Sequence, residues 1–409
     1  MLINFSTANF RSIRNRCDFS LKRHGQPQIL PENLFLSSSL KSQVLKTAIL
    51  YGANASGKSN FVRALCAMRT IVLQKGVESN ICKQLLEPFR LSTETQTQPT
   101  FFEIGICTNG RQYQYGFTCT QSRIETEWLY AKKQRMTLMF AREGDKFVDS
   151  SPDFKELSAW KNILKKTALT LPADALFLPT AAGMFAGNIC EAIHNWFNND
   201  LAILSTETYH QYLPYTLKSM DNPVFAEKIS RLISKADFGI DSLQADITKL
   251  ETTTNDVQSM QAIIHTKHVI DGQAYKFDLF NNESAGTKKV FSISAPLIDV
   301  LQHGKTLIID ELDASLHPLL VCQLIELFHK GNSTNAQMIA TVHSPSILTE
   351  TAFRRDQVWF VNKEKDGGTI LSSLADFTGI RGNFARIVKD YLHGCFGGVP
   401  YIKNLSLEE

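Results

Sequence analysis

The sequence predicts an α/β protein whose mixed sheets are built from both ends of the chain, with a mainly helical region inserted between them. Three observations predict this fold class. The apolar run at 46–51 has the form of a short buried strand and leads into an amphipathic helical pattern at 59–73. Alternating residues at 100–150 predict β-hairpins. Apolar strand patterns return at 306–309 and 337–342, after the helical region.

These elements divide the chain into three segments. Residues 1–150 form the N-terminal part of the core and include a Thr-Asn-Gly hairpin turn at 108–110. Residues 151–245 read as a helical insertion that several prolines interrupt, and no heptad pattern lasts long enough to predict a coiled-coil arm. Residues 246–409 return to short strands, with a second turn at 271–272, and then alternate between helix and strand.

Composition excludes several classes of protein. The 409 residues carry 43 Lys and Arg against 40 Asp and Glu, and this net charge of +3 argues against a surface built wholly for nucleic acid, although a local basic groove is compatible with it. No apolar run approaches the roughly 18 residues of a membrane helix. The 8 cysteines form no Cys-x-x-Cys pair, so reduced thiols in a cytoplasmic protein are expected rather than a zinc ribbon.

The clearest motif is a phosphate-binding loop at 52–59, Gly-Ala-Asn-Ala-Ser-Gly-Lys-Ser. It follows a predicted strand and opens a predicted helix, which is the context that the chemistry needs and which argues against a chance match. Small residues let backbone amides face the phosphates, and the helix N-terminus adds its positive dipole. Lys58 is expected to reach the β- and γ-phosphates, and the Ser59 hydroxyl is expected to ligate Mg²⁺.

A second candidate feature is the pair of acids that ends the strand at 306–309. Asp310 is placed to hold Mg²⁺, and Glu311 is placed to polarise water for attack on the γ-phosphate. Two acids after a strand also fit an ordinary surface turn. The presence of the phosphate loop in the same chain favours the catalytic interpretation.

Residues 283–289, Glu-Ser-Ala-Gly-Thr-Lys-Lys, precede a helical pattern that begins at Thr287. Exposed amides at this helix start, together with the Ser284 hydroxyl, would form a second anion site. The same residues also fit a simple helix N-cap, which by itself is the commoner meaning of Ser-x-Gly. Pro296 predicts a kink or short break further along the helix.

His343 stands at the end of the strand at 337–342. A lone histidine in this position is more often a polar residue with its hydrogen bonds satisfied than a catalytic one. A neutral imidazole can nevertheless bond a γ-phosphate and respond to its loss. Both interpretations stay open at the level of sequence.

The order of these elements, at positions 52, 284, 310 and 343, resembles the ABC-type ATPase heads of the Rad50, SMC and RecF group. It is most similar to the stand-alone AAA15 or AAA-21 family of ATP-binding proteins related to the OLD ATPases. Further segments like that family are 9–13, 283–289, 310–318, 341–345 and 391–400. The resemblance covers both ends of the chain well and the middle, about 150–245, poorly. It implies an ABC-type P-loop ATPase head with an inserted helical region.

The resemblance implies a homodimer or higher homo-oligomer of heads with Mg-ATP between them. Ser284 and Gly286 would reach the γ-phosphate of the partner's ATP, and Asp313 would couple the two sites. Arg11 would approach the phosphates, although an arginine on an exposed turn is an equally good interpretation. His317 is expected to be structural. The residues that would bind nucleotide within one chain are Gly52, Asn54, Gly57, Lys58 and Ser59.

The sequence departs from the related transporters at two points. The signature begins with Glu283 and has Ala285 where transporters usually have glycine, which suits this family and not a transporter. No residue is assigned to the Q-loop, because Gln84 lies near 87–90 without a context that fixes its role.

Stand-alone members of this family often look like components of bacterial antiphage or abortive-infection systems. The leading hypothesis is therefore a Mg-ATP-driven switch that hydrolyses ATP, senses an invader and controls a separate effector protein such as a nuclease or toxin, with no membrane involved. The alternative is a DNA-binding repair or recombination ATPase of Rad50 or RecF type, using lysine clusters such as Lys132–Lys133, Lys165–Lys166 and Lys288–Lys289. A scaffold with structural ATP is a third reading.

Overall fold

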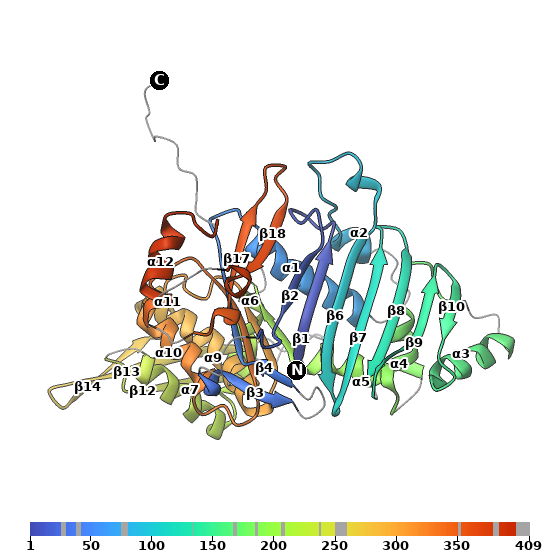
Figure 1. Ribbon diagram of the computed structural model, residues 1–409. Helices are drawn as coiled ribbons and strands as arrows, with labels where there is room; N and C mark the ends of the chain where they lie inside the picture. Colours follow the sequence, from blue (N-terminus) through green and yellow to red (C-terminus); the bar gives the residue numbers. More distant parts are fainter. Residues whose placement is uncertain are drawn as a thin grey trace.

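The computed structural model describes residues 1–25, 30–37, 42–74, 81–132, 134–166, 170–184, 187–205, 209–236, 239–249, 260–350, 353–378 and 384–397. Two large sheets lie side by side (Figure 1): an antiparallel sheet on the right and a mixed sheet surrounded by helices on the left. Two segments of the chain, 2–20 and 100–150, form the antiparallel sheet. The α/β fold with mixed sheets that the sequence predicts is confirmed.

The seven-stranded antiparallel sheet has the strand order β10-β9-β8-β7-β6-β1-β2. Its central turn adopts positive φ at Asn109 (50°) and Gly110 (70°), so the hairpin predicted at 108–110 is present. The strands are β1 Leu2–Ala8, β2 Cys17–Ser20, β6 Thr100–Thr108, β7 Arg111–Cys119, β8 Ile124–Lys132, β9 Met136–Glu143 and β10 Lys146–Ser150.

The six-stranded mixed sheet has the order β11-β15-β16-β5-β17-β18, and its neighbours are parallel except for the antiparallel pair β17–β18. Strands β5, β15 and β16 are buried along their whole length, as expected for parallel strands covered on both faces. The strands are β5 Thr47–Tyr51, β11 Leu201–Leu204, β15 Thr306–Ile309, β16 Gln337–Val342, β17 Val358–Lys363 and β18 Thr369–Ser373. A separate hairpin joins β3 Leu34–Ser37 and β4 Ser42–Leu45.

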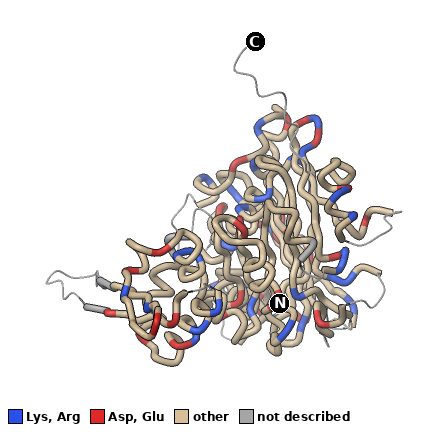
Figure 2. Tube along the Cα trace, turned by 90° about the vertical axis from the view of Figure 1, so that its left-hand side faces the viewer, with Lys and Arg blue, Asp and Glu red and all other residues tan. Residues whose placement is uncertain are grey.

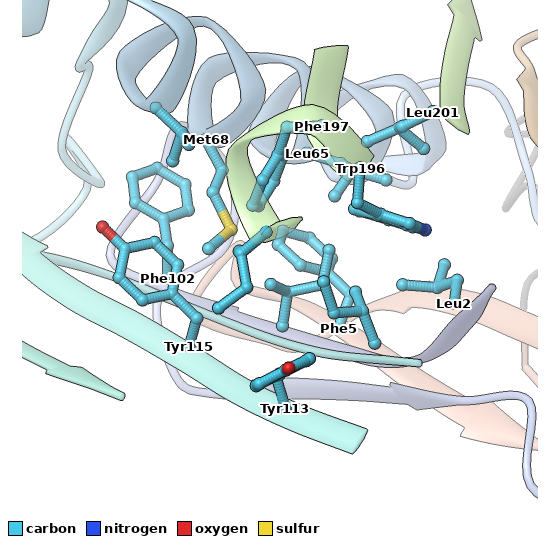
Figure 3. Packing of buried hydrophobic residues seen from close by; sticks show 14 of the residues in the cluster. Leu2, Phe5, Leu65, Met68, Phe102, Tyr113, Tyr115, Trp196, Phe197 and Leu201 are labelled. Carbon is cyan, nitrogen blue, oxygen red and sulfur yellow. The ribbon is translucent and has the colours of Figure 1, made fainter. Parts of the chain in front are cut away.

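Helix α1 (Lys58–Leu73) begins directly after the phosphate loop and is buried against the antiparallel sheet. Its Phe61 ring packs edge-on against Phe5 of β1, with 5.4 Å between ring centroids. Figure 3 shows Leu65 and Met68 of the same helix in one cluster with side chains of the sheet and of the helical region. The first helix is therefore fixed by apolar contacts on more than one side.

The helical region consists of two groups of helices with a strand between them. The first group is α3 Lys155–Lys166, α4 Phe177–Met184 and α5 Ile189–Asn195, followed by a π-helical turn η3 at Trp196–Asp200. The second is α6 Tyr209–Ser219 and α7 Pro223–Ala236. Strand β11, which pairs with β15, was not predicted. A run of four apolar residues is too short for its periodicity to distinguish strand from helix. The segment is a strand because it pairs with β15 at the edge of the sheet.

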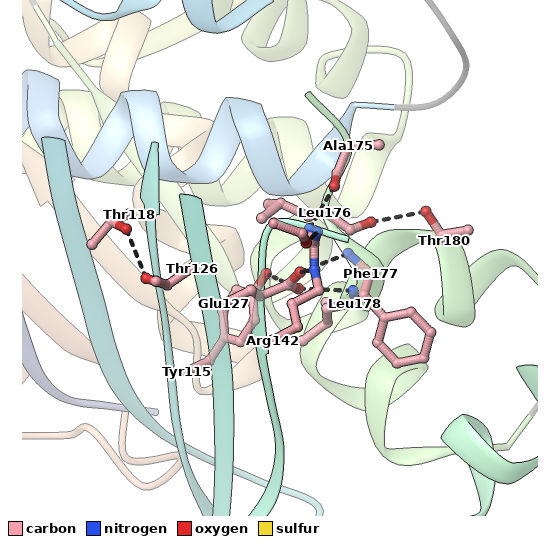
Figure 4. Close-up of polar contacts among 11 residues, drawn as sticks. Tyr115, Thr118, Thr126, Glu127, Arg142, Ala175, Leu176, Phe177, Leu178 and Thr180 are labelled. Atoms are coloured by element: carbon pink, nitrogen blue, oxygen red, sulfur yellow. Dashed lines mark hydrogen bonds and ion pairs between the residues drawn. The ribbon is translucent and has the colours of Figure 1, made fainter. Parts of the chain in front are cut away.

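A buried polar network fastens the first group of helices to the antiparallel sheet (Figure 4). Arg142 of β9 and Glu127 of β8 form an ion pair at 2.8 Å with at most 1% of either side chain exposed. The Glu127 carboxylate also accepts hydrogen bonds from the Tyr115 hydroxyl and from the amides of Phe177 and Leu178, which open α4. The acid thus neutralises Arg142 and satisfies free amides of a helix N-terminus at the same time.

The second group packs against α9 (Ala285–His303). This helix runs unbroken through Pro296, so the break predicted there is absent. Proline cannot donate to the carbonyl four residues earlier, but the Thr216 hydroxyl of α6 donates to that Ser292 carbonyl at 2.9 Å. The elements before α9 are β12 Ser242–Lys249, β13 Met260–Ile270, β14 Gln273–Asp278 and α8 Leu279–Asn282, and the turn predicted at 271–272 is present.

Further helices lie outside these groups. They are α2 Ile81–Leu85, α10 Pro318–His329, α11 Ile347–Glu350 and α12 Phe384–Leu392, with 3₁₀ turns η1 Pro31–Asn33, η2 Thr95–Thr97, η4 Arg355–Gln357 and η5 Leu374–Asp376. Helix α10 packs against β5 and β16 of the mixed sheet. Within the described ranges, no helix combines the length and apolar character that crossing a membrane requires.

Candidate nucleotide site

The candidate site lies at one edge of the mixed sheet. Strands β15, β16 and β5 are consecutive and parallel, so their carboxyl ends meet at the same edge. The phosphate loop follows β5, the two acids follow β15, and His343 follows β16. Segments that are separated by most of the chain are therefore neighbours in space.

The phosphate loop has a backbone that favours glycine at two positions. Gly57 has a φ of 113°, and a Cβ built there would lie 2.1 Å from Oγ1 of Thr369. A Cβ built on Gly52 would lie 2.5 Å from the carbonyl oxygen of Val361. The loop thus passes so close to β17 and β18 that larger residues would displace it.

Lys58 opens α1, and its side chain folds back over the loop. Nζ donates to the carbonyls of Gly52 (2.6 Å) and Ala53 (3.1 Å). Burial lowers the pKa of Lys58 from its usual range, and the nearby negative charges of Asp310, Asp313 and Glu311 oppose this shift. The lysine and the acids predicted from the sequence are thus close enough to interact electrostatically.

The loop carries polar groups without a hydrogen-bond partner, and these groups could bind a phosphate. The Oγ atom of Ser56 is buried without a hydrogen-bond partner, and the first amides of α1 have no intrahelical acceptor. Ser59 is half-buried in the first turn, and Asn54 is exposed on the loop. Among the described residues, no group of three or more His, Cys, Asp or Glu could hold a metal ion. Mg²⁺ would therefore need phosphate and water oxygens beside Ser59 and Asp310, as it usually does at phosphate sites.

A brace holds the loop from outside, and the sequence did not indicate it. The Thr369 hydroxyl of β18 lies 2.8 Å from both the Ser56 carbonyl oxygen and the Ser12 hydroxyl oxygen, and the Thr369 amide donates to the Ser12 carbonyl at 2.7 Å. The Asn60 side-chain amide of α1 donates to the same Ser12 hydroxyl at 2.7 Å. No local motif could reveal Thr369, because its partners are distant in sequence.

Thr341 aligns the two acids. Its hydroxyl donates to Oδ1 of Asp310 at 2.6 Å and accepts from the amide of Glu311 at 2.7 Å. Glu311 has a φ of 52°, in the left-handed region that a non-glycine residue adopts at a cost of about 1–3 kcal/mol. The Asp310 amide donates to Leu204 of the unpredicted strand β11 at 2.8 Å. Hydrogen bonds to Thr341 of β16 and Leu204 of β11 thus hold the turn that carries the two acids. An ordinary surface turn, the alternative in the sequence analysis, does not require such bonds.

Asp313 and His343 are joined through the backbone. Oδ2 of Asp313 accepts hydrogen bonds from the amides of His343 (2.8 Å) and Ser344 (2.7 Å), and Oδ1 is buried without a partner. The His343 side chain is exposed. The turn after the acids therefore sets the backbone of the histidine segment, and the imidazole is left accessible.

Ser284 and Gly286 occupy a different place. The Ser284 hydroxyl accepts from the Thr287 amide at 3.1 Å, so the N-cap interpretation of this residue is correct as local structure. A Cβ on Gly286 would lie 2.7 Å from the carbonyl oxygen of Ser315. In the described part of the chain, neither residue makes a hydrogen bond to 52–59. One chain does not bring this segment onto its own phosphate loop.

Lys289 contacts the turn after the acids, whereas the sequence analysis named it only within a lysine cluster for the DNA-binding alternative. Nζ donates to the carbonyls of Glu311 (2.7 Å), Leu312 (3.1 Å) and Ala314 (2.8 Å). Burial lowers its pKa to about 8, against the opposing charges of Asp313, Glu311 and Asp310. Helical spacing was an available signal, because buried Ile293 lies four residues further along α9.

Arg11 directly precedes Ser12 of the loop brace. Its guanidinium pairs with Glu87 at 2.8 Å, and its amide donates to the Glu87 carbonyl at 2.6 Å. A cavity of about 340 Å³ adjoins Arg11, Asn60 and Lys363. Arg11 is half-buried and paired, so the exposed-turn alternative does not describe it. His317 caps α10 by accepting from the Leu319 amide at 3.3 Å, a structural role as expected.

Comparison with known proteins identifies a family to which the chain is similar. The model of the family described as "AAA domain, putative AbiEii toxin, Type IV TA system" matches residues 48–159 and 185–349. No curated protein matches the chain.

Comparison with solved structures found similarity to SMC heads. One is an SMC head bound to the C-terminal winged-helix domain of ScpA, with 14% identity, a TM-score of 0.49, and coverage of 91% of this chain and 97% of that one. A second is the SMC head domain from Thermotoga maritima, with 14% identity, a TM-score of 0.42, and coverage of 91% and 98%. A third, from Pyrococcus furiosus, carries an extended coiled coil and the C-terminal domain of ScpA; it has 12% identity, a TM-score of 0.42, and coverage of 96% and 98%.

The family match covers most of the chain and includes the phosphate loop, the segment at 283–289, the acid pair and the histidine. These are the residues that meet at the sheet edge or flank it. The chain therefore belongs to the family described as "AAA domain, putative AbiEii toxin, Type IV TA system", and its fold is α/β with mixed sheets.

Proposed function

We propose that this protein binds and hydrolyses Mg-ATP and uses the nucleotide state as a switch. The observation that carries the proposal is the convergence of Lys58, Asp310 and Glu311 at one edge of the mixed sheet, where β5 and β15 both pair with β16. A buried lysine beside a glycine-rich loop and a helix N-terminus suits a polyphosphate.

Different residues of the loop would make different contacts with the nucleotide. Gly52, Asn54 and Gly57 leave space for backbone amides to approach the phosphates, and Lys58 exchanges its carbonyl partners for phosphate oxygens. Ser59 and Asp310 would hold Mg²⁺, which supplies charge neutralisation at the β- and γ-phosphates when bound. Arg11, next to Ser12 of the brace, would add a further positive charge.

Glu311 is the proposed general base for the attacking water, and the exposed His343 is the proposed contact to the γ-phosphate. Thr341 supports this assignment because it fixes the Asp310 carboxylate and the Glu311 amide through one hydroxyl. The strained backbone of Glu311 further supports it, since such conformations concentrate at functional sites.

We further propose that two heads close around the nucleotide. Ser284 and Gly286 stand at an exposed helix start and make no hydrogen bond to 52–59 in the described part of the chain. A second copy could supply its phosphate loop to this helix start, which is a ready anion site. Asp313 sits between the two sites in this arrangement and would couple them through its bonds to 343–344.

The cellular role we propose is control of a separate effector protein in bacterial defence against phage. The family description, which names the AbiEii toxin and a type IV toxin–antitoxin system, supports an effector partner. The DNA-binding alternative gains no support from the charges, because Figure 2 shows Lys and Arg mixed with Asp and Glu along the trace. Lys289, one member of the lysine clusters, points into the site instead.

The proposal is tested by measuring nucleotide binding and phosphate release for the wild type and for Glu311→Gln. We expect the variant to bind Mg-ATP as the wild type does and to release phosphate at least about 100-fold more slowly, because general-base catalysis contributes on the order of 10²–10⁴ in rate. Glu227→Gln is the matched control, since Glu227 is 68% exposed on α7. If both proteins bind ATP and neither hydrolyses it, the ATP is structural and the switch proposal fails.

A further inference from the structure

The start of α9 touches the turn at 311–315 at two points. Gly286 approaches the Ser315 carbonyl so closely that a single added Cβ would lie 2.7 Å from it. Three residues further along the helix, the ammonium group of Lys289 donates to the carbonyls of Glu311, Leu312 and Ala314, at 2.7, 3.1 and 2.8 Å. The helix and the turn are therefore connected by both packing and charge.

The turn needs this cation to keep its shape. Glu311 (φ 52°) and Ser315 (φ 61°) both adopt the left-handed conformation without being glycine. Three carbonyl oxygens that converge on one point repel one another unless a donor lies between them, and an ammonium group offers three donors. Removing it would leave three carbonyl oxygens of the strained turn without this donor.

The turn at 311–315 also positions the proposed catalytic groups. The Glu311 amide is bonded to Thr341, and the Asp313 carboxylate holds the amides of His343 and Ser344. A displacement of the turn would shift the Glu311 backbone and the histidine segment together. A continuous set of contacts thus leads from the helix start at 284–286 to both groups.

We propose that Lys289 is a positioning residue that couples occupancy of the helix start at 284–286 to the placement of Glu311 and His343 in the same chain. This inference rests on the proposed function. A nucleotide held by a second copy would pull on Ser284 and Gly286, and Lys289 lies only about 7 Å further along the helix axis, at 1.5 Å per residue. A displacement of the helix start is transmitted through the three hydrogen bonds from Lys289 to the carbonyl oxygens. Each head therefore hydrolyses its own ATP in response to the nucleotide of its partner.

The first test is Lys289→Met, which keeps the length of the side chain and removes its donors. We expect kcat for ATP to fall by about tenfold or more, because Glu311 loses its support in the closed state. The dissociation constant for ATP should stay within about twofold of wild type, since the phosphate loop is untouched. Lys330→Met is the matched control: Lys330 is 71% exposed at the end of α10, and its loss should leave kcat unchanged.

The second test asks whether Ser284 acts through Lys289. In a double-mutant cycle with Ser284→Ala, the two fold-losses in kcat should not multiply, since both variants interrupt one route. A residue that only stabilises the fold would give losses that multiply and would lower ATP affinity along with kcat. Lys289→Arg, which retains charge and donors, should recover most of the lost rate.

Each outcome decides between the alternatives. Wild-type kcat in Lys289→Met, a parallel loss of ATP affinity, or multiplicative losses in the cycle would each overturn the inference. If Lys289→Met does not fold, Lys289 has a structural role and the inference fails. An inactive wild type would instead refute the proposed hydrolysis itself, which separates the two failures.

Discussion

At the scale of single residues, Thr369 shows how the phosphate loop is held in a shape ready for ligand. Its hydroxyl lies between the Ser56 carbonyl and the Ser12 hydroxyl, and it is 1% exposed. Gly57 has no room for a side chain beside it. One hydroxyl from the C-terminal part of the mixed sheet thus links the N-terminal segment and the loop.

Replacing Thr369 by valine should weaken both the fold and nucleotide binding. Valine has the same shape but no hydroxyl, so the buried Ser56 carbonyl would lose this partner, and the half-buried Ser12 hydroxyl would keep only the Asn60 amide, at a cost of about 1–3 kcal/mol in the free energy of unfolding. ATP affinity should fall several-fold because the loop is freed. Urea unfolding and a fluorescent-nucleotide titration measure the two effects.

Thr369→Ser is the control for this substitution, because serine restores the hydroxyl with only one methyl group lost. It should lie much closer to wild type in both measurements. Equal effects of the two variants would mean that side-chain packing, and not the hydrogen bonds, supports the loop.

At the scale of elements, the end of α10 is joined to β5 by a buried histidine. His329 Nε2 lies 2.8 Å from the Thr47 hydroxyl oxygen, and the side-chain amide of Gln357 lies 3.3 Å from the same nitrogen. Burial lowers the pKa of His329 from 6.5 to about 4, with the positive charges of Lys46 and Lys330 adding to the shift. The strand that leads into the phosphate loop therefore depends on a neutral imidazole.

This contact predicts a loss of stability in mild acid. The pKa of His329 is lower in the folded than in the unfolded chain, so the unfolded chain takes up the proton first as pH falls. Stability should decline from about pH 6.5 down to about 4, and by about 2 kcal/mol between pH 7 and 5 from this group alone. Urea unfolding at both pH values measures the change.

Two variants isolate His329 from other groups. His329→Gln should show about 2 kcal/mol less acid sensitivity than wild type, since an amide can keep a hydrogen bond without titrating. His303→Gln, at a side chain 59% exposed near the end of α9, should keep the wild-type sensitivity. The same acid sensitivity in His329→Gln and wild type would contradict the assignment.

At the scale of the whole molecule, two of the residues that the sequence predicts to bind nucleotide make no hydrogen bond to the phosphate loop within the described part of the chain. The loop, the acids and His343 meet at the edge of the mixed sheet, while Ser284 and Gly286 stand at an exposed helix start beside the turn at 311–315. This separation is the reason why we propose a pair of heads. It also makes association the property most sensitive to Ser284.

Ser284→Arg should prevent ATP-dependent association. In the Glu311→Gln background, which keeps ATP intact, we expect light scattering to detect a dimer with Mg-ATP and a monomer when Ser284→Arg is added, because a long charged side chain would block the interface. Ser122→Arg, in the exposed turn before β8, is the matched control and should still dimerise. Unchanged association of the Ser284→Arg protein would refute the shared site.

Local patterns in the sequence determined the fold class, the hairpin turns at 108–110 and 271–272, and the phosphate loop with its flanking strand and helix. Each depends on residues that are close in the chain: alternation, helical spacing, or glycine in a short turn. The acids and the histidine were also identified because each follows a buried strand directly. Their roles in ATP chemistry remain proposals.

Tertiary structure alone decided the supporting contacts. It placed β11 on the open edge of the mixed sheet, carried α9 unbroken through Pro296 with the help of Thr216, and turned Lys289 toward the turn after the acids. It also set Thr369 against the phosphate loop. In each case the partners are far apart in sequence, and a hydrogen bond between them follows from how the sheets and helices pack. Local periodicity can indicate which face of a helix is buried, but it does not name the distant partner, so the sequence indicated the candidate site residues and not the contacts that hold them in place.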